Sequence, residues 1–368
     1  IPKEKQTTGD VRIEFYAAIK TAEPFLPAGT VIAREQTYVH TFYKKEATAQ
    51  QPATSKEEGN LVAFSGPDFK ATFDKQSGLL TSYLYKKHEY ILNGQGPRPF
   101  FWRAPTDNDY GANLPVRLKA WKEASYQEPK AESFQVTPGS NATTIKVTYR
   151  FPQTDARWDI TYKIYASGVI KVDNRFVAEG DQAPMIPRVG LRMQLPESFT
   201  DLTYYGRGPK ENYRDRRTSQ FIGEYAIPVK DMYEPYVRPQ ENNHRTDIYW
   251  CALTDKTQRG LLLIADRTFE LNTSNYPLES MDSGDTIDNS APRTEKTHHR
   301  HLTDPLPEKM VDLFIDYRMM GVGGDDSWGA TAHEPYLIRP GKENAIEYGF
   351  SLVPFDKKED YKYLIRQY

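Results

Sequence analysis

The stretches TIKVTYRF (residues 144–151) and WDITYKIY (residues 158–165) alternate apolar and polar side chains with a period of two. Such alternation is typical of antiparallel strands that bury one face. Similar runs recur along the chain as VRIEFYAAI, FKATF, RVGLRMQL, IYWCALT, GLLLIAD, VDLFIDY and AIEYGFSLV. No repeat has the spacing of a propeller blade. The sequence therefore predicts an all-β chain of large stacked antiparallel sheets.

Helical periodicity is scarce in this sequence. LPVRLKAWKEA (residues 114–124) follows Asn113 and places Leu114, Leu118 and Trp121 at helical spacing. This pattern predicts one short helix within a loop. The last residues, KEDYKYLIRQY, are compatible with no more than a terminal helical turn.

Composition and charge narrow the choice of partners. The chain has 368 residues, with 48 Lys and Arg against 50 Asp and Glu, and a formal charge of -2. A near-neutral chain without basic runs gives no electrostatic reason to expect nucleic acid or an anionic membrane as partner. No apolar run approaches the ~18 residues that a membrane span needs.

The single cysteine, Cys251, excludes an internal disulfide and a cysteine zinc cluster. Its neighbours predict an inert thiol in a buried strand. One cysteine fits a cytoplasmic protein, and exported bacterial proteins can also lack disulfides, so both the cytoplasm and the periplasm stay open. The chain starts without a signal peptide or a methionine, so we expect it to be part of a longer protein.

One shift in composition suggests a domain boundary. KKEATAQQPATSKEEGN (residues 44–60) has almost no large apolar side chain, which is typical of a linker. About three strands are expected before it, too few to form a sandwich alone. We therefore predict a partial β-sandwich over residues 1–45, a linker over 46–59 and one large β-domain over 60–368.

Four segments concentrate polar and aromatic residues beyond the needs of packing. They are FFWRAPTDNDYG (100–111), YYGRGPKENYRDR (204–216), YVRPQENNHR (236–245) and MMGVGGDDSWG (319–329). The candidates for lining a sugar pocket or bracing loops are Arg103, Asp107, Asn108, Arg207, Glu211, Arg238, Glu241, His244, Asp325 and Asp326. Because arginines and carboxylates also form buried ion-pair networks, both interpretations stay open.

These four segments, in this order, resemble the C-terminal region of the β-galactosidases of glycoside hydrolase family two. LPAGTVIAREQ (26–36) also resembles the end of the immunoglobulin-like domain that precedes that region. The resemblance implies a β-supersandwich similar to that of galactose mutarotases, preceded by the last strands of the immunoglobulin-like domain. It also implies that the two catalytic glutamates lie in a (β/α)₈ barrel outside this chain. The sequence agrees, because no βα alternation of ~250 residues is present.

Trp328 is the candidate for substrate binding. A glycine-flanked tryptophan on a loop is poorly placed to fill a core, and loops often carry function. The resemblance implies that this residue reaches the mouth of the barrel and stacks on the sugar in the leaving-group position. The alternative is a tryptophan that packs against a neighbouring domain. The glycines beside it are expected to act as hinges.

The aspartates in these segments have alternative interpretations. Asp325 and Asp326 are adjacent, so in an extended chain they point apart and cannot act on one bond. We expect both to accept backbone N–H bonds that shape the loop. Asp107, Asn108 and Asp109 could ligate calcium, but the ligand series of an EF-hand is missing. An Asx-rich turn braced by Arg103 is favoured.

Two histidine segments invite functional interpretations. THHRHL contains His298, His299 and His301, but no HExxH pattern accompanies them, so a surface loop is favoured over a metal site. His244 could serve as the general acid of a mutarotase, although the sequence offers no glutamate base to pair with it.

Together these features predict an accessory part of a β-galactosidase. It would support the barrel and supply Trp328 to the sugar site, with no catalytic residue and no cofactor of its own; a divalent or sodium ion in the full-length enzyme is possible. The expected partners are the barrel and other domains of the same polypeptide and a β-galactoside, and further copies of the enzyme are an additional candidate. The alternatives are a free-standing aldose mutarotase or epimerase and a carbohydrate-binding module.

Overall fold

A computed structural model describes residues 9–42, 50–179, 185–284, 301–326, 328–357 and 359–367. The chain divides into two compact units, residues 1–48 with 362–368, and residues 49–361. Within the described ranges, no helix is long and apolar enough to cross a membrane.

The first unit contains an antiparallel pair, β1 (Gly9–Ala18) and β2 (Val31–Phe42). The sequence led us to expect about three strands here, and the described residues contain two. The alternation in β1 also predicted a buried face, but Phe15 is 55% exposed. Two strands alone offer no second layer to cover that face.

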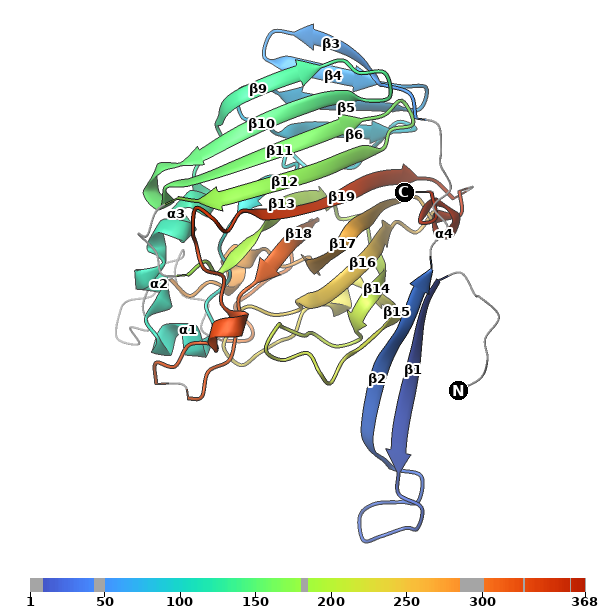
Figure 1. The fold of residues 1–368 in the computed structure, drawn as a ribbon, viewed down its shortest axis with the longest axis vertical. Helices are drawn as coiled ribbons and strands as arrows, with labels where there is room; N and C mark the ends of the chain where they lie inside the picture. The colour runs from blue at the N-terminus through green and yellow to red at the C-terminus, as the bar shows by residue number, and fades with distance from the viewer. Residues whose placement is uncertain are drawn as a thin grey trace. The chain divides into compact units, whose positions relative to one another are not determined.

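The second unit is built on a twelve-stranded antiparallel sheet (Figure 1). Its strands are β8 (Arg98–Phe100), β9 (Ala131–Thr137), β10 (Thr143–Phe151), β11 (Ala156–Ile164), β12 (Ile170–Ala178), β13 (Arg188–Pro196), β14 (Asp201–Gly208), β15 (Phe221–Pro228), β16 (Arg245–Thr254), β17 (Gly260–Ser274), β18 (Met310–Met319) and β19 (Ile346–Phe355). The main path runs β15-β14-β16-β17-β19-β12-β11-β10-β9, and β18 branches from β17 to pair with β13, which pairs with β8. Every pairing is antiparallel.

A five-stranded sheet packs against one end of the large one. Its strands are β3 (Thr54–Glu58), β4 (Leu61–Ser65), β5 (Phe69–Asp74), β6 (Leu80–Tyr85) and β7 (His88–Glu89). Phe73 joins the two layers, with its ring centroid 5.0 Å from that of Tyr162 on β11. Strand β3 lies inside the stretch predicted as a linker. All five of its side chains are exposed, which explains why its composition lacks the apolar residues of a strand.

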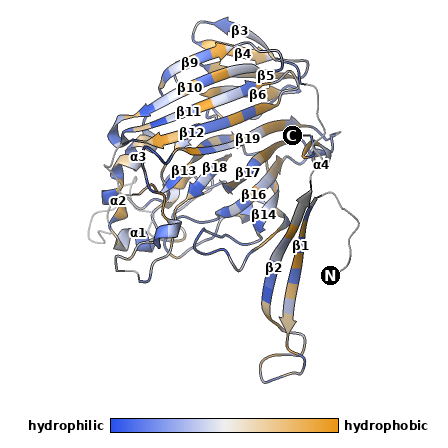
Figure 2. Ribbon diagram, viewed as in Figure 1, coloured by the Kyte–Doolittle hydropathy of each residue, from blue (hydrophilic) through white to orange (hydrophobic). Residues whose placement is uncertain are grey.

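The apolar side chains of the alternating strands form one continuous core. Along β11 every second residue is buried, and hydrophilic and hydrophobic residues alternate along β10 and β11 (Figure 2). An aromatic cluster surrounds Phe101, whose ring centroid lies 5.5 Å from that of Trp158 and 5.4 Å from that of Phe176. The chain is therefore the all-β, antiparallel supersandwich that the sequence predicted. Cys251 is fully buried on β16, and burial raises the pKa of its thiol.

Short helices occupy the long connections. The segment after Asn113 forms two helices, α2 (Leu114–Arg117) and α3 (Lys119–Tyr126), instead of the single one predicted. The break lies at Leu118, whose φ of -112° departs from helical geometry while its side chain stays buried. The remaining helices and 3₁₀ turns are α1 (Asp107–Gly111), α4 (Tyr361–Leu364), η1 (Pro152–Thr154), η2 (Val229–Asp231), η3 (Leu278–Met281) and η4 (Glu334–Tyr336).

Candidate functional site

Trp328 lies on the long connection between β18 and β19, and 90% of its surface is exposed. The loop around it is shaped locally. Asp326 accepts hydrogen bonds from the backbone N–H groups of Trp328 (2.8 Å) and Ala330 (3.3 Å). The carboxylate of Asp325 pairs with the exposed His333 ring at 2.9 Å, and the backbone bonds that we expected for it stay a prediction. The loop thus presents a bare indole on a turn closed by Asp326.

The start of this loop is held by Asp215, which lies more than a hundred residues earlier in the chain. Its carboxylate accepts hydrogen bonds from the backbone N–H groups of Val322 (3.2 Å) and Gly323 (2.8 Å). A Cβ atom on Gly321 would lie 2.5 Å from Oδ2 of Asp215. The glycine at 321 is therefore required by close packing.

Arg103 holds the same stretch from the other side. Its guanidinium donates to the backbone carbonyls of Met320 (2.7 Å) and Gly321 (3.1 Å). It also forms a two-point ion pair with Asp109, with N–O distances of 3.0 and 2.7 Å. Although burial opposes its charge, Asp109 raises the pKa of Arg103. All these groups are buried, so the bonds connect the loop firmly to the sheet.

Asp109 belongs to α1, where we expected an Asx-rich turn. The segment forms a short helix with a capping box, in which Asp109 and Thr106 exchange hydrogen bonds. Two acidic residues in its first turn favour a helix start, because they complement the free N–H groups there. Asp107 is exposed and lies 3.8 Å from Arg238, while Asn108 contributes its backbone carbonyl to the helix.

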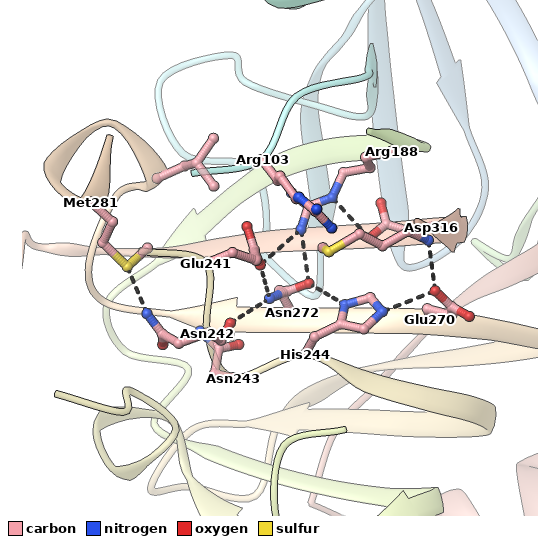
Figure 3. Close-up of polar contacts among 12 residues, drawn as sticks. Arg103, Arg188, Glu241, Asn242, Asn243, His244, Glu270, Asn272, Met281 and Asp316 are labelled. Carbon is pink, nitrogen blue, oxygen red and sulfur yellow. Dashed lines mark hydrogen bonds and ion pairs between the residues drawn. The ribbon is translucent and has the colours of Figure 1, made fainter. Parts of the chain in front are cut away.

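A second polar cluster lies in the interior and centres on His244 (Figure 3). Nδ1 of His244 lies 2.6 Å from Oδ1 of Asn272, and Nε2 lies 2.9 Å from Oε2 of Glu270. The amide nitrogen of Asn272 donates to Glu241 (2.9 Å) and to the carbonyl of Asn242 (2.8 Å), which fixes its oxygen toward the histidine. Each ring nitrogen of His244 therefore faces a side-chain oxygen within hydrogen-bond distance.

Glu270 is the acidic centre of this cluster. Its carboxylate accepts hydrogen bonds from Nε of Arg214 (2.5 Å) and the backbone N–H of Met319 (2.7 Å), in addition to His244. Burial disfavours its charge, yet the hydrogen bond from His244 and the charge of Arg214 lower the pKa of Glu270. The His244 ring is fully buried and stacks on Tyr213 with centroids 5.3 Å apart. No face of the imidazole is left for a sugar.

Arg188 connects the histidine cluster to a second carboxylate. It donates to Asn272 (3.0 Å) and Glu241 (3.2 Å), and its Nε lies 3.2 Å from Oδ2 of Asp316. Arg188 is the charge partner of Asp316, but neither carboxylate oxygen of Asp316 accepts a hydrogen bond of good geometry from the described residues. Its carboxylate also occupies the space where a Cβ atom of Gly190 would lie, so only glycine fits on the facing strand. Burial, partly offset by Arg188, raises the pKa of Asp316 to about 7.

This shift predicts a pH dependence of stability. Between about pH 4, where a free aspartate titrates, and about pH 7, folded Asp316 retains a proton that the unfolded chain has lost. Its contribution to stability is therefore complete below about pH 4 and is lost as the pH rises through about 7. In Asp316→Asn this dependence should disappear. The difference in unfolding free energy between the native chain and the variant should then change by about 2–4 kcal/mol between pH 4 and 8.

Urea unfolding of both proteins across this range measures the difference. Asp231→Asn, a substitution at an exposed residue, is the control. A constant difference between the native chain and Asp316→Asn at all pH values would contradict the protonated state of Asp316.

The remaining candidates contact residues of neighbouring segments. Glu211 accepts the backbone N–H of Asn243 at 2.8 Å and pairs with Arg216 and Tyr236. Arg207 pairs with Asp247 at 2.9 Å, and Arg238 lies over the ring of Tyr110 at 4.6 Å. Glu241 and His244 share the buried cluster, whereas Trp328, Asp325 and Asp326 share the exposed loop. The structure therefore separates the sequence candidates into an exposed loop, its supports and a buried network.

The described residues contain no group of three His, Cys, Asp or Glu side chains placed to hold a metal ion. His298 and His299 lie outside the described residues, and His301 is exposed beside Asp304, whose carboxylate accepts its backbone N–H.

Sequence reasoning missed several members of these clusters. Glu270, Asn272 and Asp316 lie on β17 and β18 among apolar neighbours, and all three are buried. A signal was available, since charged residues in the middle of the apolar runs FELNTS and LFIDY are costly unless they are paired. Their partners could not be identified, because Arg188 is separated from Asp316 by more than a hundred residues.

A profile of the family described as "Beta galactosidase small chain" matches residues 65–352. The chain belongs to this family. A β-galactosidase of Priestia megaterium is 33% identical over 291 residues, which are 79% of this chain and 26% of that protein. A β-galactosidase of Streptococcus thermophilus is 27% identical over 348 residues, which are 93% of this chain and 32% of that protein. This small-chain sequence thus spans about a third or less of these relatives.

Among solved structures, a putative mutarotase of Salmonella typhimurium covers 86% of this small-chain protein, with 10% identity and a TM-score of 0.45. The assignment to the small-chain family therefore depends on the sequence match. The assignment of the supersandwich fold depends on the strand pairings described above.

Proposed function

We propose that this chain is the accessory C-terminal part of a β-galactosidase and that it supplies the Trp328 loop to the sugar site of a catalytic barrel. The observation that carries the proposal is an indole with 90% of its surface exposed, on a loop whose start is held by the buried Arg103 and the partly buried Asp215. Loop residues positioned by a rigid scaffold often carry binding function. The flat indole face suits the C–H face of a sugar ring.

The division of labour within the whole protein is part of this proposal. A retaining glycosidase needs two carboxyl groups about 5–5.5 Å apart that face one substrate. The acidic residues near Trp328 do not meet this need, because Asp326 binds backbone groups and Asp325 binds His333. We therefore infer that hydrolysis belongs to a barrel of the same polypeptide, which fits the greater length of the relatives.

The alternative of a free-standing mutarotase has less support. Such an enzyme needs a histidine and a glutamate that reach the ring oxygen and the C1 hydroxyl of a sugar. His244 and Glu270 form a pair, but both are fully buried and their polar atoms are already bonded to each other, Asn272, Arg214 and Met319. The geometry favours a structural role for this pair.

Hydrolysis of an aryl β-galactoside tests the proposal. We expect the isolated 368-residue chain to show no turnover and the full-length polypeptide that contains it to be active. The optical rotation of fresh α-galactose should also change no faster with the chain than without it. Turnover by the isolated chain that His244→Gln abolishes would refute the division of labour, and accelerated mutarotation would favour the alternative.

A further inference from the structure

The large sheet carries a groove that the proposed function does not use. Its volume is about 1080 Å³, and it crosses β9, β10, β11, β12, β19, β17 and β18. On β10 the groove side carries Lys146 and Thr148, whereas Ile145 on the opposite side is buried in the core. Seven strands spaced about 4.8 Å apart span roughly 30 Å. The groove is therefore long enough for an extended chain molecule.

The acidic residues of the groove all have cationic partners. The ion pairs are Asp159 with Arg157 (2.9 Å), Asp173 with Lys171 (3.0 Å), Asp266 with Lys171 (2.6 Å) and Glu347 with Arg175 (3.4 Å). Such pairs hold the side chains in place and leave carboxylate lone pairs that can accept hydroxyl donors.

Three further cations line the groove without an acidic partner among the described residues. They are Lys146, Arg267 and Arg318. Nε of Arg318 is buried and lacks a hydrogen-bond partner, and its guanidinium lies 5.3 Å from the ring centroid of Tyr317. These three side chains leave the groove with positive charge that no carboxylate of the described residues balances.

We propose that this groove binds an oligosaccharide that carries carboxylate groups. The positive charge of Lys146, Arg267 and Arg318 favours an anionic ligand, and an Arg matches a carboxylate in two-point geometry. The paired acids of the groove keep lone pairs for hydrogen-bond donors, which sugar hydroxyls supply. Galacturonate oligomers supply both the carboxylates and the hydroxyls.

The mixed charge of the lining argues against other extended ligands. A nucleic acid presents one phosphate per nucleotide and would meet Asp159, Asp173 and Asp266 along the groove. An apolar peptide would leave these charges without water or partners. An uncharged glycan could bond to the acids and to the cations, but it would leave the charges of Lys146, Arg267 and Arg318 unbalanced. A ligand with many hydroxyls and few carboxylates fits best.

Calorimetric titration of the chain with α-1,4-linked hexagalacturonate tests this inference. We expect binding at least tenfold tighter than that of a neutral galactan hexamer, and weaker binding at high salt because the contacts are ionic. Arg318→Gln and Arg267→Gln should each weaken the binding of hexagalacturonate about tenfold. Lys256→Gln, on an exposed turn outside the groove, is the matched control and should change nothing.

Three results would overturn the inference: no binding of hexagalacturonate, equal binding of the neutral hexamer, or equal binding of polyglutamate, which has the carboxylates without the hydroxyls. Arg267 is exposed, so its variant tests the groove even if Arg318→Gln fails to fold. The titration needs neither Trp328 nor hydrolysis. Its failure is therefore distinct from a failure of the proposed function.

Discussion

Trp328→Ala in the full-length β-galactosidase is expected to weaken the interaction with the leaving-group sugar by about 1–3 kcal/mol, or roughly 5- to 150-fold. The physical reason is the loss of one indole face, which buries about 100 Å² against a sugar ring. At ~25 cal/mol/Å² this area contributes about 2.5 kcal/mol. Steady-state kinetics with lactose, and transfer to added glucose as acceptor, measure the loss.

Stability should separate this role from a structural one. Since 90% of the Trp328 surface is exposed, its truncation should leave urea unfolding of the chain unchanged. Trp328→Phe keeps an aromatic face and should recover part of the lost binding. Leu306→Ala, which truncates another exposed apolar side chain, is the control and should alter neither property. Unaltered kinetics in Trp328→Ala would exclude stacking on the sugar.

Arg103→Met is expected to lower the unfolding free energy of the chain by about 3–5 kcal/mol. The substitution leaves the Asp109 carboxylate buried without its counter-charge, and it removes the donors of the Met320 and Gly321 carbonyls. Methionine is similar to the arginine stem in length, so most of the loss comes from polar groups and not from a cavity. Urea unfolding measures the change.

The ion pair between Arg150 and Glu132 gives a matched comparison. Its N–O distance is 3.2 Å, but the two side chains are 44% and 51% exposed. Arg150→Met should therefore cost well under about 1 kcal/mol. Similar small losses of unfolding free energy in Arg103→Met and Arg150→Met would show that the bonds of Arg103 do not hold the loop in place. The double variant Arg103→Met with Asp109→Leu should recover part of the stability, because no charge is then left buried alone.

The sequence predicted the strands whose apolar and polar residues alternate. It did not predict the features that depend on contacts between residues far apart in the chain. Alternation in TIKVTYRF and WDITYKIY correctly gave β10 and β11, because a half-buried strand imposes a period of two. The order of the four polar segments indicated the small-chain family. Strand β3 escaped detection because an exposed edge strand of TSKEE has no buried face to mark it.

The site shows the same division. Trp328 was recognisable as a loop residue because glycines surround it, and its exposure agrees with that interpretation. The glutamate that pairs with His244 was not recognisable, because Glu270 lies 26 residues later on another strand. Only the antiparallel pairing of β16 with β17 brings the two together. Pairing across strands is a property of register, which local periodicity does not report.

The fastening of the Trp328 loop has a consequence for protein engineering. Arg103 and Asp215 form hydrogen bonds with the backbone of residues 320–323. These bonds fix the direction in which the chain leaves β18, independently of the residues at the tip of the loop. In the described part of the tip, Asp325 and Asp326 bond to groups of the same loop. Tips of different length and aromatic content can therefore be grafted between these anchor points as a cassette. A library of such tips would vary the side chain presented in place of Trp328 without redesigning the scaffold.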